Sequence, residues 1–114
     1  MIDERLPFVL EADVRLQPGT DPAALGAAVT TALCGHWEHE GPCRWPHNNE
    51  ADAAVSVASF RTIFVSPAEE EPDVRTRIEG ALRGGSGWEL LNVRARPLRV
   101  DEEPLAGRLA SSAR

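Results

Sequence analysis

The feature that most constrains this chain is a run of regular alternation between Phe8 and Leu16. Apolar side chains occupy every second position of this run: Phe8, Leu10, Ala12, Val14 and Leu16. Val9, Glu11, Asp13 and Arg15 lie between them. Because successive side chains of a β-strand point to opposite faces, the pattern predicts a strand with one buried face and one mostly polar face.

Two segments with helical spacing predict the layer that covers the buried face. The first follows the turn at Pro18-Gly19, where Thr20 or Asp21 can cap a helix that stops at Gly35. Its apolar positions are Leu25, Ala28, Val29, Ala32 and Leu33. The second begins near Pro72 and carries Val74, Ile78, Ala81 and Leu82 at i, i+4, i+7 and i+8. Each pattern predicts an amphipathic helix packed on a sheet.

Three further segments have the composition of strands. We expect a short strand over residues 36–40 that runs into a long loop, a long strand over residues 53–65 and a last strand over residues 88–98. The resulting order predicts an α+β fold, specifically a ferredoxin-like β-α-β-β-α-β sandwich. Its antiparallel four-stranded sheet would carry two helices on one face. We expect one domain over residues 1–100 and a flexible C-terminal tail over residues 101–114.

Composition excludes several classes of function. The net charge of -6 argues against nucleic acid as a partner, because such proteins normally carry a basic stripe. No apolar run is long enough to cross a membrane and no export signal is evident, so we expect a cytoplasmic protein with reduced cysteines. Every basic residue is Arg and none is Lys, which is typical of a bacterial genome of high GC content.

All cysteines and histidines of the chain fall in one segment, from Cys34 to His47. The segment contains Cys34, His36, His39, Cys43 and His47, together with Trp37 and Trp45. Thiolate and imidazole are the groups that bind zinc, so the clustering suggests a metal-binding loop. The paired spacing of a zinc finger is absent. We therefore hypothesise a zinc site without a recognised motif.

Strand parity limits which of these side chains can converge. On a strand, His36 points to the face opposite Trp37 and His39. The most reachable set is His39, Cys43 and His47, with Cys34 as a fourth ligand. Three ligands with an open position would suit hydrolysis, whereas four would form a structural clip.

The same segment supports two other hypotheses. A small histidine-dependent enzyme would use His36, His39 or His47 as a general base beside Glu38 or Glu40, in a pocket walled by Trp37 and Trp45. A protein-interaction module would instead use Trp37 and Trp45 as exposed anchors. The leading hypothesis is a small binding domain, and the sequence names no substrate or ligand.

The polar face of the predicted sheet suggests a partner. If the first and last strands are antiparallel neighbours, Glu11, Asp13 and Arg15 lie near Asn92, Arg94 and Arg96. Such a face can be solvated, or it can pack against a second copy to form a homodimer or larger homo-oligomer. The outward positions lack the aromatic residues on which RNA bases would stack.

Overall fold

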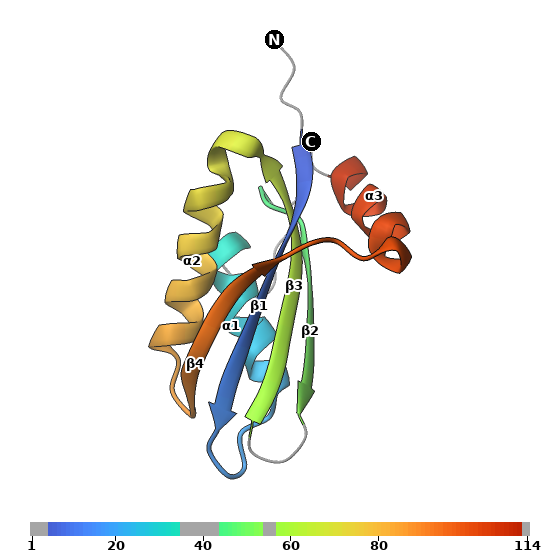
Figure 1. Cartoon of the computed structure of the whole chain (residues 1–114). Helices are drawn as coiled ribbons and strands as arrows, with labels where there is room; N and C mark the ends of the chain where they lie inside the picture. The colour runs from blue at the N-terminus through green and yellow to red at the C-terminus, as the bar shows by residue number, and fades with distance from the viewer. Residues whose placement is uncertain (1–4, 35–43, 54–56, 113–114) are drawn as a thin grey trace.

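The computed structural model describes residues 5–34, 44–53 and 57–112. The elements are β1 (Arg5–Leu16), α1 (Ala23–Cys34), β2 (His47–Ala53), β3 (Val57–Pro67), α2 (Glu71–Gly84), β4 (Trp88–Arg96) and α3 (Glu103–Ser112), with short 3-10 turns η1 (Ala68–Glu70) and η2 (Val100–Glu102). The strands form one antiparallel sheet in the order β2-β3-β1-β4 (Figure 1). The chain therefore has the predicted α+β class.

The C-terminal helix was not predicted. With α3 added, the element order is β1-α1-β2-β3-α2-β4-α3, so the fold is not the two-helix ferredoxin-like sandwich. The prediction of a flexible tail over residues 101–114 is wrong for residues 103–112, which form α3. Two local features favour this helix: the Glu102 carboxylate accepts the N–H of Arg99 at 2.8 Å, and Ala106 is buried.

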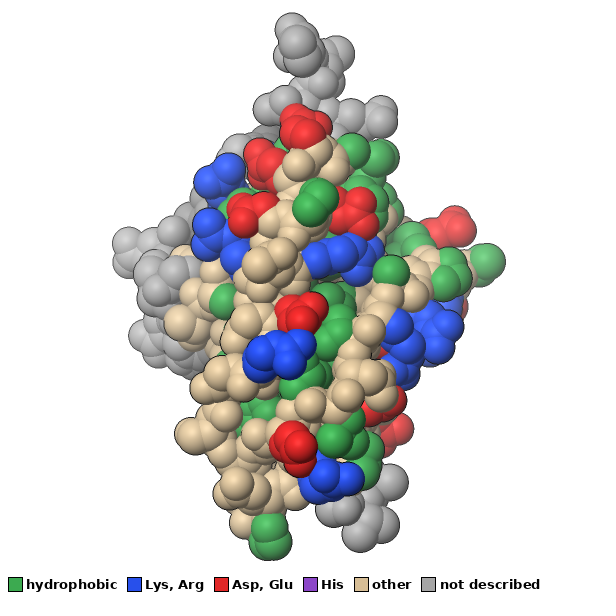
Figure 2. All heavy atoms as spheres, turned by 60° about the vertical axis from the view of Figure 1, so that its left-hand side comes forward, with side chains coloured by type: hydrophobic (Ala, Val, Ile, Leu, Met, Phe, Trp, Pro, Cys, Tyr) green, Lys and Arg blue, Asp and Glu red, His purple; other side chains and the backbone are tan. Residues whose placement is uncertain are grey.

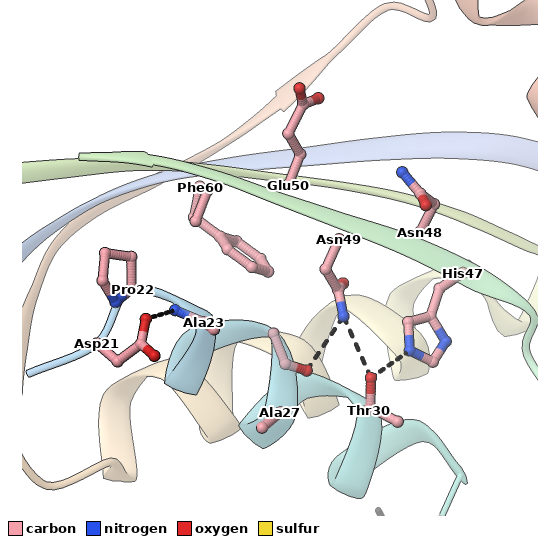
Figure 3. A pocket seen from close by; sticks show the side chains of 12 residues that line it. Asp21, Pro22, Ala23, Ala27, Thr30, His47, Asn48, Asn49, Glu50 and Phe60 are labelled. Atoms are coloured by element: carbon pink, nitrogen blue, oxygen red, sulfur yellow. Dashed lines mark hydrogen bonds between the residues drawn. The ribbon is translucent and has the colours of Figure 1, made fainter.

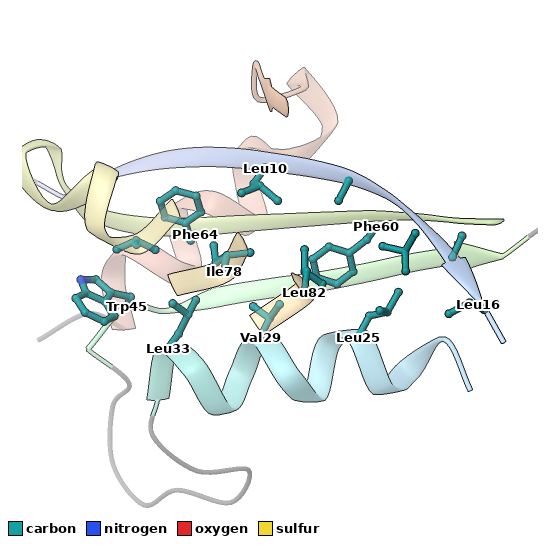
Figure 4. Close-up of a cluster of buried hydrophobic side chains, with 14 residues drawn as sticks. Leu10, Leu16, Leu25, Val29, Leu33, Trp45, Phe60, Phe64, Ile78 and Leu82 are labelled. Atoms are coloured by element: carbon teal, nitrogen blue, oxygen red, sulfur yellow. The ribbon is translucent and has the colours of Figure 1, made fainter. Parts of the chain in front are cut away.

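The main core lies between the sheet and the helices α1 and α2. The alternating apolar residues of β1 face it as predicted, and Leu10, Ala12 and Val14 are almost fully buried. Leu25, Val29 and Leu33 of α1 pack from below the sheet in Figure 4, while Val74, Ile78 and Leu82 come from α2. Phe60 and Phe64 of β3 complete the cluster.

The edge strand β2 lies in a segment for which the sequence analysis expected a loop. β2 spans His47–Ala53 at the edge of the sheet, whereas the expected strand at residues 36–40 lies outside the described residues. The long predicted strand over residues 53–65 corresponds to β3, which begins at Val57. β2 was missed because its sequence, HNNEADA, has no β-branched or aromatic apolar residue.

The outer face of the sheet is covered at one end. α3 contacts β3 and β1 from the side opposite α1 and α2 (Figure 1). Val9 and Ile63 are paired across β1 and β3 on this outer face, and both are almost fully buried. The second half of β3 is consequently buried on both faces, which explains why its burial does not alternate there.

A β-bulge changes which face of β4 carries its leucines. Asp13 pairs with Asn92 but Val14 pairs with Leu90, so Leu91 is the extra residue. Leu90 packs against the core, and Leu91 is exposed. Regular alternation through the strand would have placed these two leucines on the opposite faces.

The surface over α2 carries charges of both signs. Figure 2 shows acidic and basic side chains interspersed on this side of the molecule, with apolar side chains scattered between them. Several belong to i,i+4 ion pairs of α2, such as Arg75–Glu71 and Arg77–Asp73. In the part of the chain that the structure describes, no helix has the length and apolar character needed to cross a membrane.

Candidate functional site

The predicted Cys/His site is only partly visible. His36, Trp37, His39 and Cys43 lie outside the described residues, so their assignment as metal ligands or pocket residues stays a prediction. Cys34, Trp45 and His47 are described, and they lie at the end of α1, before β2 and at the start of β2. Within the described ranges, no three or more His, Cys, Asp or Glu side chains are grouped so that they could hold a metal ion.

Cys34 differs from its predicted state. It is disulfide-bonded, not a reduced thiol. The sequence contains one other cysteine, Cys43, which lies outside the described residues. A sulfur held in a disulfide is not the thiolate that zinc binds, so Cys34 would have to be reduced before it could act as a ligand. Disulfides are rare in the cytosol, and the cytoplasmic location stays a prediction.

Trp45 is buried and is not an exposed anchor. Its side chain lies in the main core beside Leu33 (Figure 4), with 2% of the residue exposed. The indole Nε1 donates to the Glu70 carboxylate at 2.8 Å, and the guanidinium groups of Arg44 and Arg77 lie 4.5 and 4.9 Å from the ring centroid. These contacts hold the indole of Trp45 in the core next to the start of β2, which is a structural role.

His47 begins a chain of polar contacts between β2 and α1. Its Nδ1 lies 3.0 Å from the backbone oxygen of Trp45, and its Nε2 lies 3.0 Å from the Thr30 hydroxyl. The Asn49 amide nitrogen donates to the same hydroxyl at 3.2 Å and to the backbone oxygen of Gly26 at 3.1 Å. Helix and edge strand are therefore joined by side-chain hydrogen bonds as well as by packing.

These contacts form one wall of a groove between α1 and β2. The groove has a volume of 540 Å³ and runs from the start of α1 to His47 (Figure 3). On the helix side it is lined by Asp21, Pro22, Ala23, Gly26, Ala27 and Thr30, and on the sheet side by residues 47–51 and Phe60. In Figure 3 the side chains of His47 and Asn49 point toward α1, and that of Glu50 points away from the helix.

The sequence explains why the groove is not filled. Four of the helix positions that face β2 are small, namely Ala23, Gly26, Ala27 and Thr30. Gly26 allows the closest approach, because a Cβ there would lie 3.3 Å from the Asn49 Cβ. The strand contributes short or polar side chains at 47, 49 and 51, so no large apolar residue bridges the two elements.

The two ends of the groove differ chemically. At the start of α1, the Asp21 carboxylate accepts the N–H of Ala23 at 3.0 Å, as the predicted helix cap. Pro22, Ala23, Ala27 and Ala51 form an apolar stretch. At the other end, Thr30 and His47 provide a hydroxyl and an imidazole, so the groove offers one apolar and one polar region.

The sequence analysis did not identify Thr30 or Asn49 as candidate site residues. Thr30 is an ordinary polar residue in a helix, and its contact with His47 joins residues of two different elements. Asn49 follows two positions after His47, so strand parity would have placed both on one face if β2 had been recognised. No sequence signal identified Thr30.

A second polar cluster lies on the outer face of the sheet. The Arg61 side chain is 9% exposed, and it pairs with Glu11 of β1 and with both carboxylate oxygens of Glu102, at 2.7 and 2.8 Å. Arg61 also donates to the backbone oxygen of Pro97 at 3.2 Å. The predicted pairing of Asp13 and Glu11 with Arg94 across β1 and β4 is confirmed.

The carboxylates of this cluster are held in their charged form. Burial alone would raise the pKa of Glu11, but hydrogen bonds from Arg61 and Arg96 and the charges of Arg61 and Arg94 outweigh it, so the pKa lies below its usual value. The hydrogen bond from Arg61 likewise lowers the pKa of Glu102. Because these acids and bases neutralise each other, the cluster ties η2 and α3 to the sheet.

Comparison with known proteins supports the fold and no more. No protein-family model and no curated protein sequence matches this chain. A solved structure that is similar is the de novo designed protein Foldit4, with a TM-score of 0.54 and 14% sequence identity. The match covers 82% of this chain and 100% of the designed one. At this identity the likeness concerns the arrangement of strands and helices alone.

Proposed function

We propose that this chain is a small binding domain that takes a small organic molecule into the groove between α1 and β2. The observation that carries the proposal is the groove itself, whose 540 Å³ falls within the usual range of ligand pockets. An apolar stretch with a polar group at one end is the arrangement by which such pockets hold and orient a ligand. Of the described residues in the predicted segment from Cys34 to His47, only His47 lines this site. The walls of the site are formed by α1 and β2.

The ligand should combine an apolar body with a polar head. The body would lie along Ala23, Ala27 and Ala51, and the head would reach Thr30 and His47. The probe that we choose is 4-nitroacetanilide, an aromatic ring with a small amide. Binding should perturb the backbone amide resonances of residues 23–30 and 47–51 in a titration followed by NMR, with residues of α3 unaffected.

A matched pair of variants tests the location. Ala27→Leu places a larger side chain in the groove and should abolish binding of 4-nitroacetanilide. Thr31→Leu, on the same helix, changes an exposed residue that does not line the groove and should leave binding unchanged. If the probe perturbs no groove residue, or if both variants bind it equally, the proposed function is wrong.

The surface that we propose for contact between two copies of the chain is smaller than the whole outer face of the sheet. α3 covers one end of the outer face of the sheet. The neighbouring cross-strand positions of Val57, Arg15 and Glu89 lie at the other end of that face. Val57 is 40% exposed there. We propose that two copies meet through this uncovered end. Light scattering should then show a dimer that Arg15→Glu weakens, whereas a monomer at high protein concentration would contradict the proposal.

A further inference from the structure

The hydrogen bonds around Thr30 determine where its proton lies. A backbone carbonyl oxygen can only accept, so the contact between Trp45 and His47 requires a hydrogen on Nδ1. In the neutral ring, Nε2 then carries a lone pair and accepts the hydroxyl hydrogen of Thr30. Thr30 Oγ1 in turn accepts the hydrogen bond from the Asn49 amide. In this neutral tautomer the hydroxyl proton of Thr30 points at the imidazole lone pair.

This arrangement is that of an activated nucleophile. A hydroxyl within hydrogen-bond reach of a base, with the base oriented by a third group, is the geometry that nucleophilic catalysis requires. Here the distances are 3.0 Å from Thr30 Oγ1 to His47 Nε2 and 3.0 Å from His47 Nδ1 to the Trp45 oxygen. Both side chains line the groove, so a bound molecule would meet them directly (Figure 3).

We propose that Thr30 accepts an acyl group from a small ester bound in the groove, with His47 as the general base. This inference rests on the proposed function, because the ester must first occupy the groove. The substrate class is a small ester whose apolar part lies along the alanines and whose carbonyl reaches Thr30. The Asn49 amide is a positioning group, since its hydrogen bond holds the Thr30 oxygen against the strand.

The reaction requires no other reactant than the ester and water. Thr30 Oγ1 attacks the carbonyl carbon and forms the new C–O bond while its proton passes to His47 Nε2. The C–O bond to the leaving alcohol then breaks, and the alcohol takes that proton from His47. Water hydrolyses the acyl-threonine with the same imidazole as base, which returns both groups to their starting state.

Among the described residues, the group that orients His47 is the backbone oxygen of Trp45, 3.0 Å from Nδ1. A neutral carbonyl orients the ring and selects the same tautomer, but it stabilises the imidazolium less than a carboxylate would. We therefore expect a slow reaction in which the acyl-threonine accumulates. The measurable product is one acyl group per chain, found on Thr30.

The test uses 4-nitrophenyl acetate, the ester of nearly the same shape as 4-nitroacetanilide. Release of nitrophenol is followed by absorbance, and the acetylated residue is located by mass spectrometry of peptides. The chain contains no lysine, so no lysine amine competes for the acetyl group. Acetylation of Thr30 should be lost in Thr30→Val, kept in Thr30→Ser, and slowed by about 100-fold or more in His47→Gln. Thr31→Val, at an exposed neighbouring position, should react like the parent chain.

The outcomes separate the two proposals. If 4-nitroacetanilide binds in the groove but the ester leaves Thr30 unmodified, the inference is overturned and the proposed function stands. If Thr30 is acetylated equally fast in His47→Gln, the role of His47 as base is wrong. If neither probe reaches the groove, both proposals fail. Thr30→Ser shows whether a loss of reaction in Thr30→Val reflects the missing hydroxyl or a disturbed fold, since it restores only the hydroxyl.

Discussion

Replacing Arg61 with methionine should lower the free energy of unfolding by about 3 kcal/mol, because the guanidinium group is a buried partner of two carboxylates. Removing one member of a buried ion pair costs roughly 3–5 kcal/mol, since the other member is left without its counter-charge. Methionine keeps the apolar stem of arginine, so the change removes mainly the charge and its hydrogen bonds.

The structure places the expected effect at the lower end of that range. Glu11 keeps Arg94 and Arg96 at 3.3 Å, and both of these arginines are partly exposed. Glu102 keeps the N–H of Arg99 but loses both contacts with Arg61. The uncompensated charge is therefore chiefly that of Glu102, at the start of α3. The helix should detach from the sheet before the main core opens.

Urea unfolding measures the loss, and hydrogen exchange locates it. With a slope near 1.5 kcal/mol per molar urea, the midpoint should fall by about 2 M. Amides of residues 103–111 should lose protection first. Arg83→Met is the matched control, because the Arg83–Glu79 pair is 65% and 43% exposed and contributes about 0.5 kcal/mol or less. A change in Arg61→Met no larger than that of the control would refute the reasoning.

Three further predictions follow from single features. Because folding lowers the pKa values of Glu11, Asp13 and Glu102, their contribution to the free energy of unfolding should be complete above about pH 5 and lost as pH falls through the folded-state pKa values. Urea titrations at several pH values should show a weaker loss of stability in acid for Glu102→Gln than for the parent chain. The same pH dependence in both proteins would contradict this prediction. Gly85→Ala should lower the melting temperature well below that of Gly84→Ala, because a Cβ at 85 would lie 1.9 Å from the Trp88 ring whereas one at 84 meets nothing within 4 Å. Cys34 should resist iodoacetamide until a reductant is added, as peptide mass spectrometry can check, and labelling without reductant would show that it is not disulfide-bonded.

The fold was predictable where packing imposes a regular period. β1 alternates because one face meets the helices and the other meets charged residues, and α2 repeats its apolar residues because only one side is covered. β2 lacks this alternation of apolar and polar residues because its inward side chains line a groove and are themselves polar or short. Its sequence therefore does not predict a strand. α3 was missed because only a short stretch around Ala106 is buried, which is too little for a helical pattern to stand out.

The candidate site was less predictable than the fold. The sequence drew attention to His47, but its partner Thr30 is brought there by the packing of α1 on the edge strand. Local spacing cannot report a contact between two elements whose relative placement depends on the whole core. Trp45 illustrates another limit, because one hypothesis from the sequence made it an exposed anchor, whereas it lies in the core.

The position of β1 in the sheet bears on the order in which the chain can fold during synthesis. β1 is made first, yet its neighbours are β3 and β4, with Arg15 opposite Val57 and Leu16 opposite Trp88. The first helix can form early, but it has no completed sheet to pack on until these later strands emerge. The nascent chain must therefore carry a strand with one apolar face and open edges until β3 and β4 have been made, which makes β1 a segment that a chaperone would meet.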